Sequence, residues 1–430
     1  ATERIDRAAT HRVLGPAIFL AVMGLIFQAV YAWAIPFMDA IEQGAAWTAA
    51  RVGALLGAGM LTDLLTDGVI AGVGNVVVFL PQICLLFLFL TLLEQAGYLA
   101  RAAFLMDRVM RSLGLHGKAF LPLMSSFACA IPGVMATRTI ENRRDRLVTI
   151  LVAPLMSCSA RLPVYTLLIG AFIPSPWQGW TLLSMYALSV TAALVAAWVL
   201  RKTLVRGEPS TFLLELPPYR VPGARHVAAA VLHRAGAFVR QAGTIILALS
   251  VMIWFLTTFP RSEEVAGEAR ARVAAGEPAG AVADWERGEQ IRGSVAGRLG
   301  RAIEPAIEPL GFDWRIGVGI IGAFAAREVL VSTLGIVYSV GDADEVSPAL
   351  REKLRGSTRP DGRASFNALT AVSLMVFFVL ACQCMSTLAV VKRETNSWRW
   401  PLFMFGYMTV LAYAGSLAVY QGGAFLGLGP

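Results

Sequence analysis

The sequence predicts an all-α polytopic membrane protein with about seven transmembrane helices and two re-entrant or broken helical segments. Of its 430 residues, 56% are hydrophobic and only 15% are charged, whereas soluble domains carry about 25% charged residues. Several uncharged stretches also approach the roughly 20 residues that a helix needs to cross a bilayer. Composition and pattern therefore both indicate a protein whose first partner is the lipid bilayer.

The net charge of +8 does not indicate nucleic acid as a partner. The basic residues gather at the ends of apolar spans, where the positive-inside rule places them. The first twelve residues are polar and basic, unlike a signal peptide. The chain is therefore expected to be a fragment that begins partway through a longer protein.

The apolar stretches give the expected elements in order. Seven of them are expected to be spans, at about residues 13–35, 72–93, 147–173, 180–200, 241–259, 366–391 and 400–421. Two more are interrupted: Pro132 lies inside 119–137, and Arg327 with Glu328 lies inside 316–340. A helix can break at membrane depth only where the freed backbone faces protein or a polar cavity.

The charged loops assign sides of the membrane. The basic amino terminus is expected in the cytoplasm, and the acidic connection 36–71 outside. Loops 98–118 and 138–146 are both basic and therefore both internal, yet only segment 119–137 separates them. The charge count thus predicts that 119–137 is a re-entrant hairpin entered from the cytoplasm.

The charged segments in the second half of the chain assign sides of the membrane in the same way. Segment 201–240 is basic and internal, whereas 261–315 is slightly acidic, external and either helical or loose. Lys392, Arg393 and Arg399 then mark an internal loop. This alternation holds only if 316–340 is also re-entrant, in this case from outside.

An internal repeat appears when the sequence is shifted by 197 positions. Arg101 then falls on Arg298, Asp107 on Glu304, and Phe127-Ala128 on Phe324-Ala325. The charge count gives the two copies opposite orientations, which is typical of transporters built from inverted repeats. The expected organisation is an amino-terminal region 1–71, a first gate module 72–200, a cytoplasmic linker 201–240, a second gate module 241–421 with the insertion 261–315, and a tail 422–430.

Cysteines are the candidate ligands of a soft or borderline cation such as Fe²⁺, Zn²⁺ or Cu⁺. Those in broken or polar stretches form the expected ion path with their neighbours: Cys129, Cys158, Cys382, Cys384, Met385 and Ser159. The alternative is that each cysteine is only a small apolar residue packed between helices. Cys84 lies in a plain apolar run and is assigned to that alternative.

Four charged residues lie in or beside the spans: Arg161, Arg327, Glu328 and Glu94. A charge inside a span costs at least about 2.5–3.5 kcal/mol, so it normally faces a polar cavity or a partner. Each residue therefore either lines the pathway or belongs to a structural ion pair, such as Arg327 with Glu328.

An enzyme is not expected. The four histidines lie in loops or flanks, and no nucleophile with a base is visible. The segment 114–118 lacks the full phosphate-loop pattern, so this chain holds no nucleotide by that motif.

Several long stretches resemble the membrane domain of the FeoB family of bacterial ferrous-iron transporters. They include GYLARAAFLMDRVMRSLGLHGKAF, MSCSARLPVYTLL, AIEPLGFDWRIGVGI and AAREVLVSTLGIVY, and the likeness runs from about residue 3 to residue 421. The resemblance implies a cytoplasmic domain that binds GTP and Mg²⁺ ahead of this chain. It also implies Fe²⁺ as transported substrate and an ion path at Cys129, Cys158 and the Cys382–Cys384 region. The family more commonly has Asn where Ala130 stands, and an acid where Gln95 stands.

The expected function is transport of Fe²⁺ across the bacterial inner membrane into the cytoplasm. The expected partners are the GTPase domain, a small cytoplasmic accessory protein and a further copy of the chain. The alternatives are a gate-fold carrier of Mn²⁺, another divalent metal or a nucleoside, and a membrane sensor of a GTPase that transports nothing.

Overall fold

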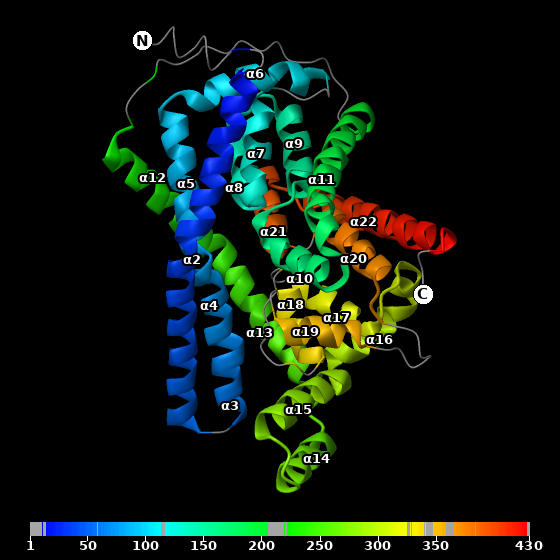
Figure 1. Cartoon of the computed structure of the whole chain (residues 1–430). Helices are drawn as coiled ribbons and strands as arrows, with labels where there is room; N and C mark the ends of the chain where they lie inside the picture. The colour runs from blue at the N-terminus through cyan, green and yellow to red at the C-terminus, as the bar shows by residue number, and fades with distance from the viewer. Residues whose placement is uncertain are drawn as a thin grey trace. The chain divides into compact units, whose positions relative to one another are not determined.

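The computed structural model describes residues 11–427 apart from 12–13, 58, 113–116, 205–218, 220–221, 325–326, 328, 339, 341–346, 358–364 and 383. Every regular element among these described residues is a helix, as the sequence predicts (Figure 1). The chain divides into two compact units. Unit 1 consists of Ala1–Pro154, Ala193–Val251 and Ala389–Ser397, and unit 2 of Leu155–Ala192, Met252–Leu388 and Trp398–Pro430.

Within the part of the chain that the structure describes, six helices, some of them joined across short breaks, are long and apolar enough to cross a bilayer. They are Leu14–Leu56, Met60–Gln95, Arg143–Phe172, Ser175–Thr203, Ala368–Thr395 and Arg399–Phe425. A seventh span is present if Thr244–Thr258 and Glu263–Ala274, which are bent by 76°, count as one. The prediction of about seven spans is confirmed.

Unit 1 holds most of the amino-terminal helices. Its members are α2 (Leu14–Leu56), α3 (Met60–Asp63), α4 (Ala71–Val78), α5 (Leu80–Gln95), α6 (Tyr98–Ser112), α7 (Phe120–Ala128), α8 (Ala130–Ala136), α9 (Arg143–Val152) and α12 (Ala224–Phe238). Three further helices belong partly to this unit: the end of α11 (Ser175–Thr203), the start of α13 (Thr244–Thr258) and most of α21 (Met385–Thr395).

Unit 2 is built around the second interrupted segment. Its members are α10 (Leu162–Phe172), α14 (Glu263–Ala274), α15 (Ala279–Gly293), α16 (Val295–Ile307), α17 (Trp314–Ala323), α18 (Val329–Val337), α19 (Pro348–Arg355), α20 (Ala368–Leu380) and α22 (Arg399–Phe425).

The first helix is longer than the sequence analysis expected. It continues to Leu56 through Pro36, instead of ending near residue 35. The added stretch contains six alanines, and alanine is the strongest helix former. Most of the expected connection 36–71 is thus helical, because α3 and a π-helix, Leu64–Ile70, follow.

The first interrupted segment forms a helical hairpin in unit 1. Helices α7 and α8 pack against each other (Figure 1), and Cys129 between them has an extended backbone, with φ −155° and ψ 135°. Gly133 permits this close packing, because a Cβ there would lie 1.9 Å from Oγ of Ser126 and 2.7 Å from the carbonyl oxygen of Pro122. The expectation of a hairpin over 119–137 is confirmed.

The second interrupted segment forms the corresponding hairpin in unit 2. Helices α17 and α18 pack closely, and a Cβ on Gly319 would lie 2.6 Å from Leu330. Arg327 lies between the two helices, while Glu328 falls outside the described residues. The hairpin expected within 316–340 is therefore present.

The order of elements repeats along the chain. An amphipathic helix (α6, α16) precedes a hairpin (α7–α8, α17–α18), then a broken span (α9–α10, α20–α21) and a long helix (α11, α22). The amphipathic helices and the hairpins agree with the 197-residue shift, whereas the long helices begin 224 residues apart, at Ser175 and Arg399. The boundary between the two compact units falls within the broken spans, because each of these spans has one half in unit 1 and the other half in unit 2.

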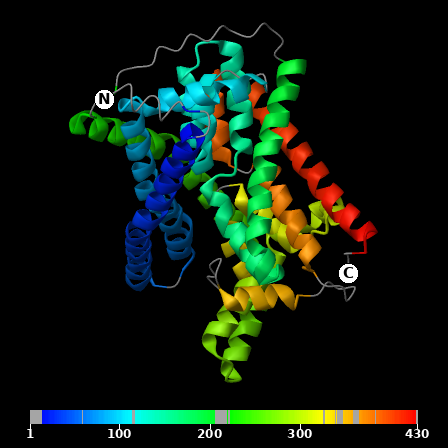
Figure 2. The same cartoon turned by 45° about the horizontal axis from the view of Figure 1, so that its top comes forward.

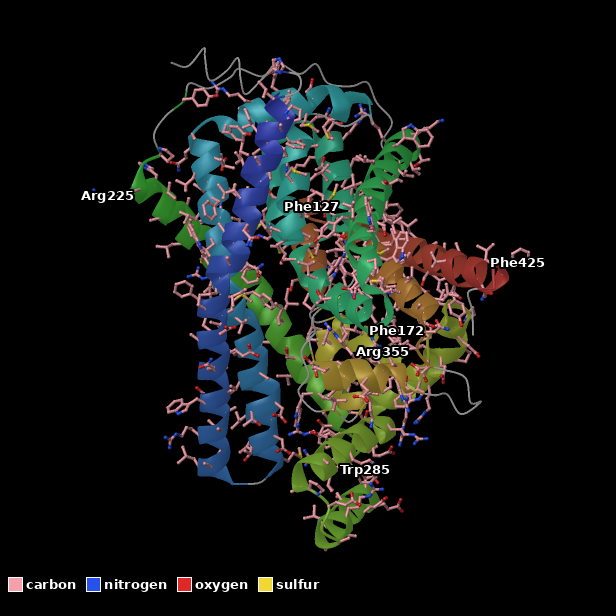
Figure 3. The ribbon with its side chains drawn as sticks, viewed as in Figure 1. Phe127, Phe172, Arg225, Trp285, Arg355 and Phe425 are labelled. Carbon is pink, nitrogen blue, oxygen red and sulfur yellow. The ribbon has the colours of Figure 1, made fainter. Side chains whose placement is uncertain are left out.

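Local contacts hold unit 2 together around buried side chains of α10, α17, α18 and α20. Ser373 of α20 and Ser416 of α22 share a hydrogen bond of 2.6 Å between their hydroxyl oxygens, a kind of contact that joins helices in membranes. Arg355 of α19 donates to the carbonyl of Ala171, beside Phe172 at the end of α10 (Figure 3).

The insertion 261–315 is helical. Helices α14 and α15 form a pair at one end of unit 2 (Figure 2), and Ser262 caps α14 by accepting a hydrogen bond from the backbone N–H of Val265. The expected linker 201–240 also contains helix α12. It continues through a π-helix, Val239–Gly243, into α13.

Candidate ion path at two broken helices

The first break in unit 2 surrounds Cys158. Helix α9 ends at Val152, Cys158 has an extended backbone with φ −80° and ψ 165°, and α10 begins at Leu162. Pro154 and Pro163 flank the break, and a proline has no N–H to continue a helix. The backbone is thus freed from helical hydrogen bonding next to a thiol.

The hydroxyl of Ser189 in α11 replaces some of the helical hydrogen bonds that are lost at this break. Its hydroxyl accepts from the N–H of Ser157 at 2.7 Å and donates to the carbonyl of Leu155 at 3.0 Å. Both groups lie in the break, and Ser189 is fully buried. Ser189 could not be singled out from the sequence, because a single serine in an apolar helix carries no distinguishing pattern.

Arg161 is also directed to this break. It is fully buried, and its Nη1 donates to the carbonyl of Leu155 and to Oγ of Ser157, both at 3.2 Å. A guanidinium that binds freed backbone stabilises the broken conformation. This geometry favours the structural interpretation of Arg161 over a place in the pathway.

The second break surrounds Cys382 and Cys384. Helix α20 ends at Leu380, Ala381 is extended with φ −75° and ψ 148°, and α21 begins at Met385. Cys382 is buried and Cys384 is half-buried. The expected span 366–391 is therefore broken at its cysteines, as 147–173 is broken at Cys158.

Arg327 joins the two breaks from the tip of the α17–α18 hairpin. Its Nη2 donates to the carbonyl of Ala381 at 3.1 Å, and its Nη1 lies 4.0 Å from Sγ of Cys158. The backbone N–H of Met385 donates to the carbonyl of Phe324 at 3.3 Å, so the hairpin also contacts the second break directly. Unit 2 thus brings together Cys158, the Ala381–Cys384 break and Arg327.

The remaining candidate ligands are Cys129, Ser159 and Met385. Cys129 is half-buried at the tip of the α7–α8 hairpin and belongs to unit 1. Ser159 directly follows Cys158 and is half-buried, whereas Met385 is 36% exposed. Among the described residues, no group of three His, Cys, Asp or Glu side chains could hold a metal ion. The candidate path offers thiols and backbone carbonyls instead of a preformed metal centre.

Glu94 lies at the end of α5, outside this arrangement. It accepts from Arg234 of α12 at 3.2 Å, and its side chain is 52% exposed. An exposed ion pair of this kind contributes at most about 1 kcal/mol. The geometry favours the structural interpretation.

A buried carboxylate in unit 1 was not anticipated. Glu394, near the end of α21, is only 3% exposed and accepts from Arg138 and Arg146 at 3.0 and 2.7 Å. The hydrogen bonds to Glu394 raise the pKa of the Arg138 guanidinium above its ordinary value. Two of the basic residues of loop 138–146 therefore hold the end of α21.

The hairpins and the broken spans define a gate-type membrane protein, and the comparisons agree. The gate family described as nucleoside recognition matches residues 76–172 and 239–398. The carboxy-terminal family of ferrous iron transport protein B matches residues 182–234. No solved structure matches the chain.

The chain belongs to the FeoB family. It is 46% identical over 426 residues to the Fe(2+) transporter FeoB of Leptospira interrogans, covering 97% of this chain and 59% of that protein. It is 39% identical over 430 residues to the Fe(2+) transporter FeoB of Staphylococcus aureus strain COL, covering 98% and 59%. A Porphyromonas gingivalis relative, 41% identical over 98% of this chain and 51% of its own length, is a fusion of Fe(2+) transport protein A with FeoB. The chain thus spans about three fifths or less of the length of these relatives.

Proposed function

We propose that this chain is the membrane domain of a transporter that moves Fe²⁺ into the cytoplasm across the bacterial inner membrane. The names of its relatives support Fe²⁺ as the substrate. The observation that carries the proposal is the convergence of Cys158 and the Ala381–Cys384 break on Arg327. Two helices broken at cysteines give freed carbonyls and thiols at one place, as an ion path through a membrane requires.

The chemistry of the two breaks suits a borderline cation. Thiolates bind Fe²⁺ well, and backbone carbonyls can replace some of its hydration shell. In the structure, the Arg327 guanidinium donates a hydrogen bond to the Ala381 carbonyl, the oxygen that would otherwise bind such an ion. The described arrangement is therefore a closed state, and an ion passes when Arg327 leaves this carbonyl.

The energy source lies outside this chain in the proposal. A GTPase domain, using GTP and Mg²⁺ on the cytoplasmic side, would move the hairpin that carries Arg327. The fusion in the Porphyromonas gingivalis relative supports a small accessory protein as a further partner. The chain itself is then a transporter and not an enzyme.

The test is Fe²⁺ uptake by the full-length protein in proteoliposomes. Replacing both Cys158→Ser and Cys382→Ser should lower uptake roughly tenfold or more, since the soft ligands are lost. Cys84→Ser, in the continuous helix α5, is the matched control and should leave uptake unchanged. Full uptake by the folded double variant would refute the cysteine path. Addition of a nucleoside distinguishes Fe²⁺ transport from the alternative of a nucleoside carrier, because a nucleoside should not compete with Fe²⁺.

A further inference from the structure

Unit 1 contains a cavity of about 750 Å³ that the proposed ion path does not use. Helices α2, α5, α7, α8 and α12 contribute to its wall. Much of the wall is apolar, formed by residues such as Phe19, Met23, Leu86, Leu121 and Met124. Its volume falls within the range of small-molecule binding sites.

The cavity also carries an excess of positive charge. Four arginines line it together with a single carboxylate, Glu94; the arginines are Arg138, Arg234, Arg240 and Arg393. Arg138 and Arg234 already bind Glu394 and Glu94. Among the residues that the structure describes, neither Arg240 nor Arg393 forms an ion pair, and both are exposed. Two guanidinium groups therefore remain available beside an apolar wall.

The backbone positions these two arginines in different ways. Arg240 lies in the π-helix Val239–Gly243 between α12 and α13, and π-helical turns inside helices are frequent at functional sites. Arg393 directly precedes Glu394, whose buried bonds to Arg138 and Arg146 hold the end of α21. The two side chains thus come from segments far apart in the sequence that meet at one cavity.

All four arginines come from segments that the charge count assigns to the cytoplasmic side: 138–146, 201–240 and the loop that begins at Lys392. The cytoplasmic leaflet is rich in anionic lipids, and basic pockets between membrane helices bind their headgroups. A cation such as Fe²⁺ would be repelled by this set of charges. The chemistry of the cavity thus matches a molecule with an anionic head and an apolar tail.

We propose that this cavity binds an anionic phospholipid, with the phosphate on Arg240 and Arg393 and an acyl chain along the apolar wall. Leu232 of α12 lines the cavity and is 71% exposed, which gives the acyl chain an open flank toward lipid. Ser125, Ala128 and Pro132 line the same cavity. The bound lipid therefore contacts both helices of the hairpin that carries Cys129.

The experiment measures lipid binding to the full-length protein in nanodiscs of phosphatidylcholine that contain fluorescent phosphatidylglycerol. The wild type should prefer phosphatidylglycerol over a matched phosphatidylcholine probe. In the double variant Arg240→Gln with Arg393→Gln, this preference should fall roughly 25-fold, about fivefold for each arginine. Arg143→Gln with Arg144→Gln removes the same charge from exposed positions at the start of α9, outside the cavity, and should keep the preference.

Two results would overturn the proposal. The first is an unchanged preference in the Arg240 and Arg393 variant, or an equal loss in the control variant, which would indicate diffuse attraction to anionic lipid. The second is displacement of the lipid probe by soluble glycerol phosphate as effectively as by phosphatidylglycerol, because the apolar wall would then contribute nothing. Neither readout requires Fe²⁺ uptake, so the lipid site and the proposed transport can fail separately.

Discussion

Arg327 is the residue on which the two broken helices of unit 2 converge. Its guanidinium donates to the Ala381 carbonyl and lies 4.0 Å from the Cys158 sulfur. At this distance, and with an effective dielectric constant of 20, two unit charges interact by about 4 kcal/mol. A buried arginine here therefore both holds the break and opposes a cation that approaches Cys158.

Replacement of Arg327→Gln should open the path. The variant loses the repulsive charge, so Fe²⁺ leakage into proteoliposomes without GTP should rise about tenfold or more, a change that needs only about 1.4 kcal/mol. Arg327→Lys keeps the charge and is the matched control; it should stay closed. The measurement is the initial rate of Fe²⁺ uptake without nucleotide. Equal leakage in the wild type and the Gln variant would contradict Arg327 as the closing residue.

Among the elements, the α7–α8 hairpin depends on one glycine. A methyl group on Gly133 would lie 1.9 Å from Oγ of Ser126, and overpacking of this kind costs about 1–3 kcal/mol. Gly133→Ala should therefore lower the midpoint of thermal unfolding in detergent. Gly179→Ala is the control, since a Cβ at Gly179 of α11 meets nothing within 4 Å. The close-packed hairpin would be disproved by equal midpoints for the two variants.

The end of α21 depends on the buried Glu394 carboxylate. Glu394→Gln removes the charge that pairs with Arg138 and Arg146, at a cost of about 1–3 kcal/mol. The same substitution at Glu141 should cost less than about 1 kcal/mol, because that carboxylate pairs with Lys118 while 89% exposed. Thermal unfolding of both variants compares the two pairs directly. A Glu141 variant that is the less stable of the two would show that Glu394 does not anchor α21.

For the whole molecule, the sequence predicted what depends on local pattern. Apolar length gave the spans, and Pro132 and Arg327 marked the two hairpins. Pro154 marked the break at Cys158, whereas residues 366–391 contain no proline, so only the polar stretch around Cys382 and Cys384 distinguished the second break. These features are local because a helix breaks where its own backbone cannot continue.

The partners that stabilise the breaks could not be predicted. Ser189 lies 32 residues from the Ser157 N–H that it accepts from, and Glu394 lies 256 residues from Arg138. Such pairs depend on the packing of distant helices, which no single-sequence pattern encodes. The length of α2 was missed for another reason: the charges of residues 36–56 suggested a connection, while the six alanines there favour helix.

The inverted repeat leads to a prediction about the two faces of the membrane. The order of elements is the same in both copies, and the charge count gives the copies opposite orientations. Arg144 at the start of α9 and Glu264 at the start of α14 are both exposed. Arg144→Cys should therefore react with a membrane-impermeant maleimide only from the cytoplasmic side, and Glu264→Cys only from the opposite side. The parent protein, with its five cysteines, gives the background labelling in intact cells and in inside-out vesicles. Reaction of both positions from the same side would rule out the inverted arrangement while leaving the helical hairpins untouched.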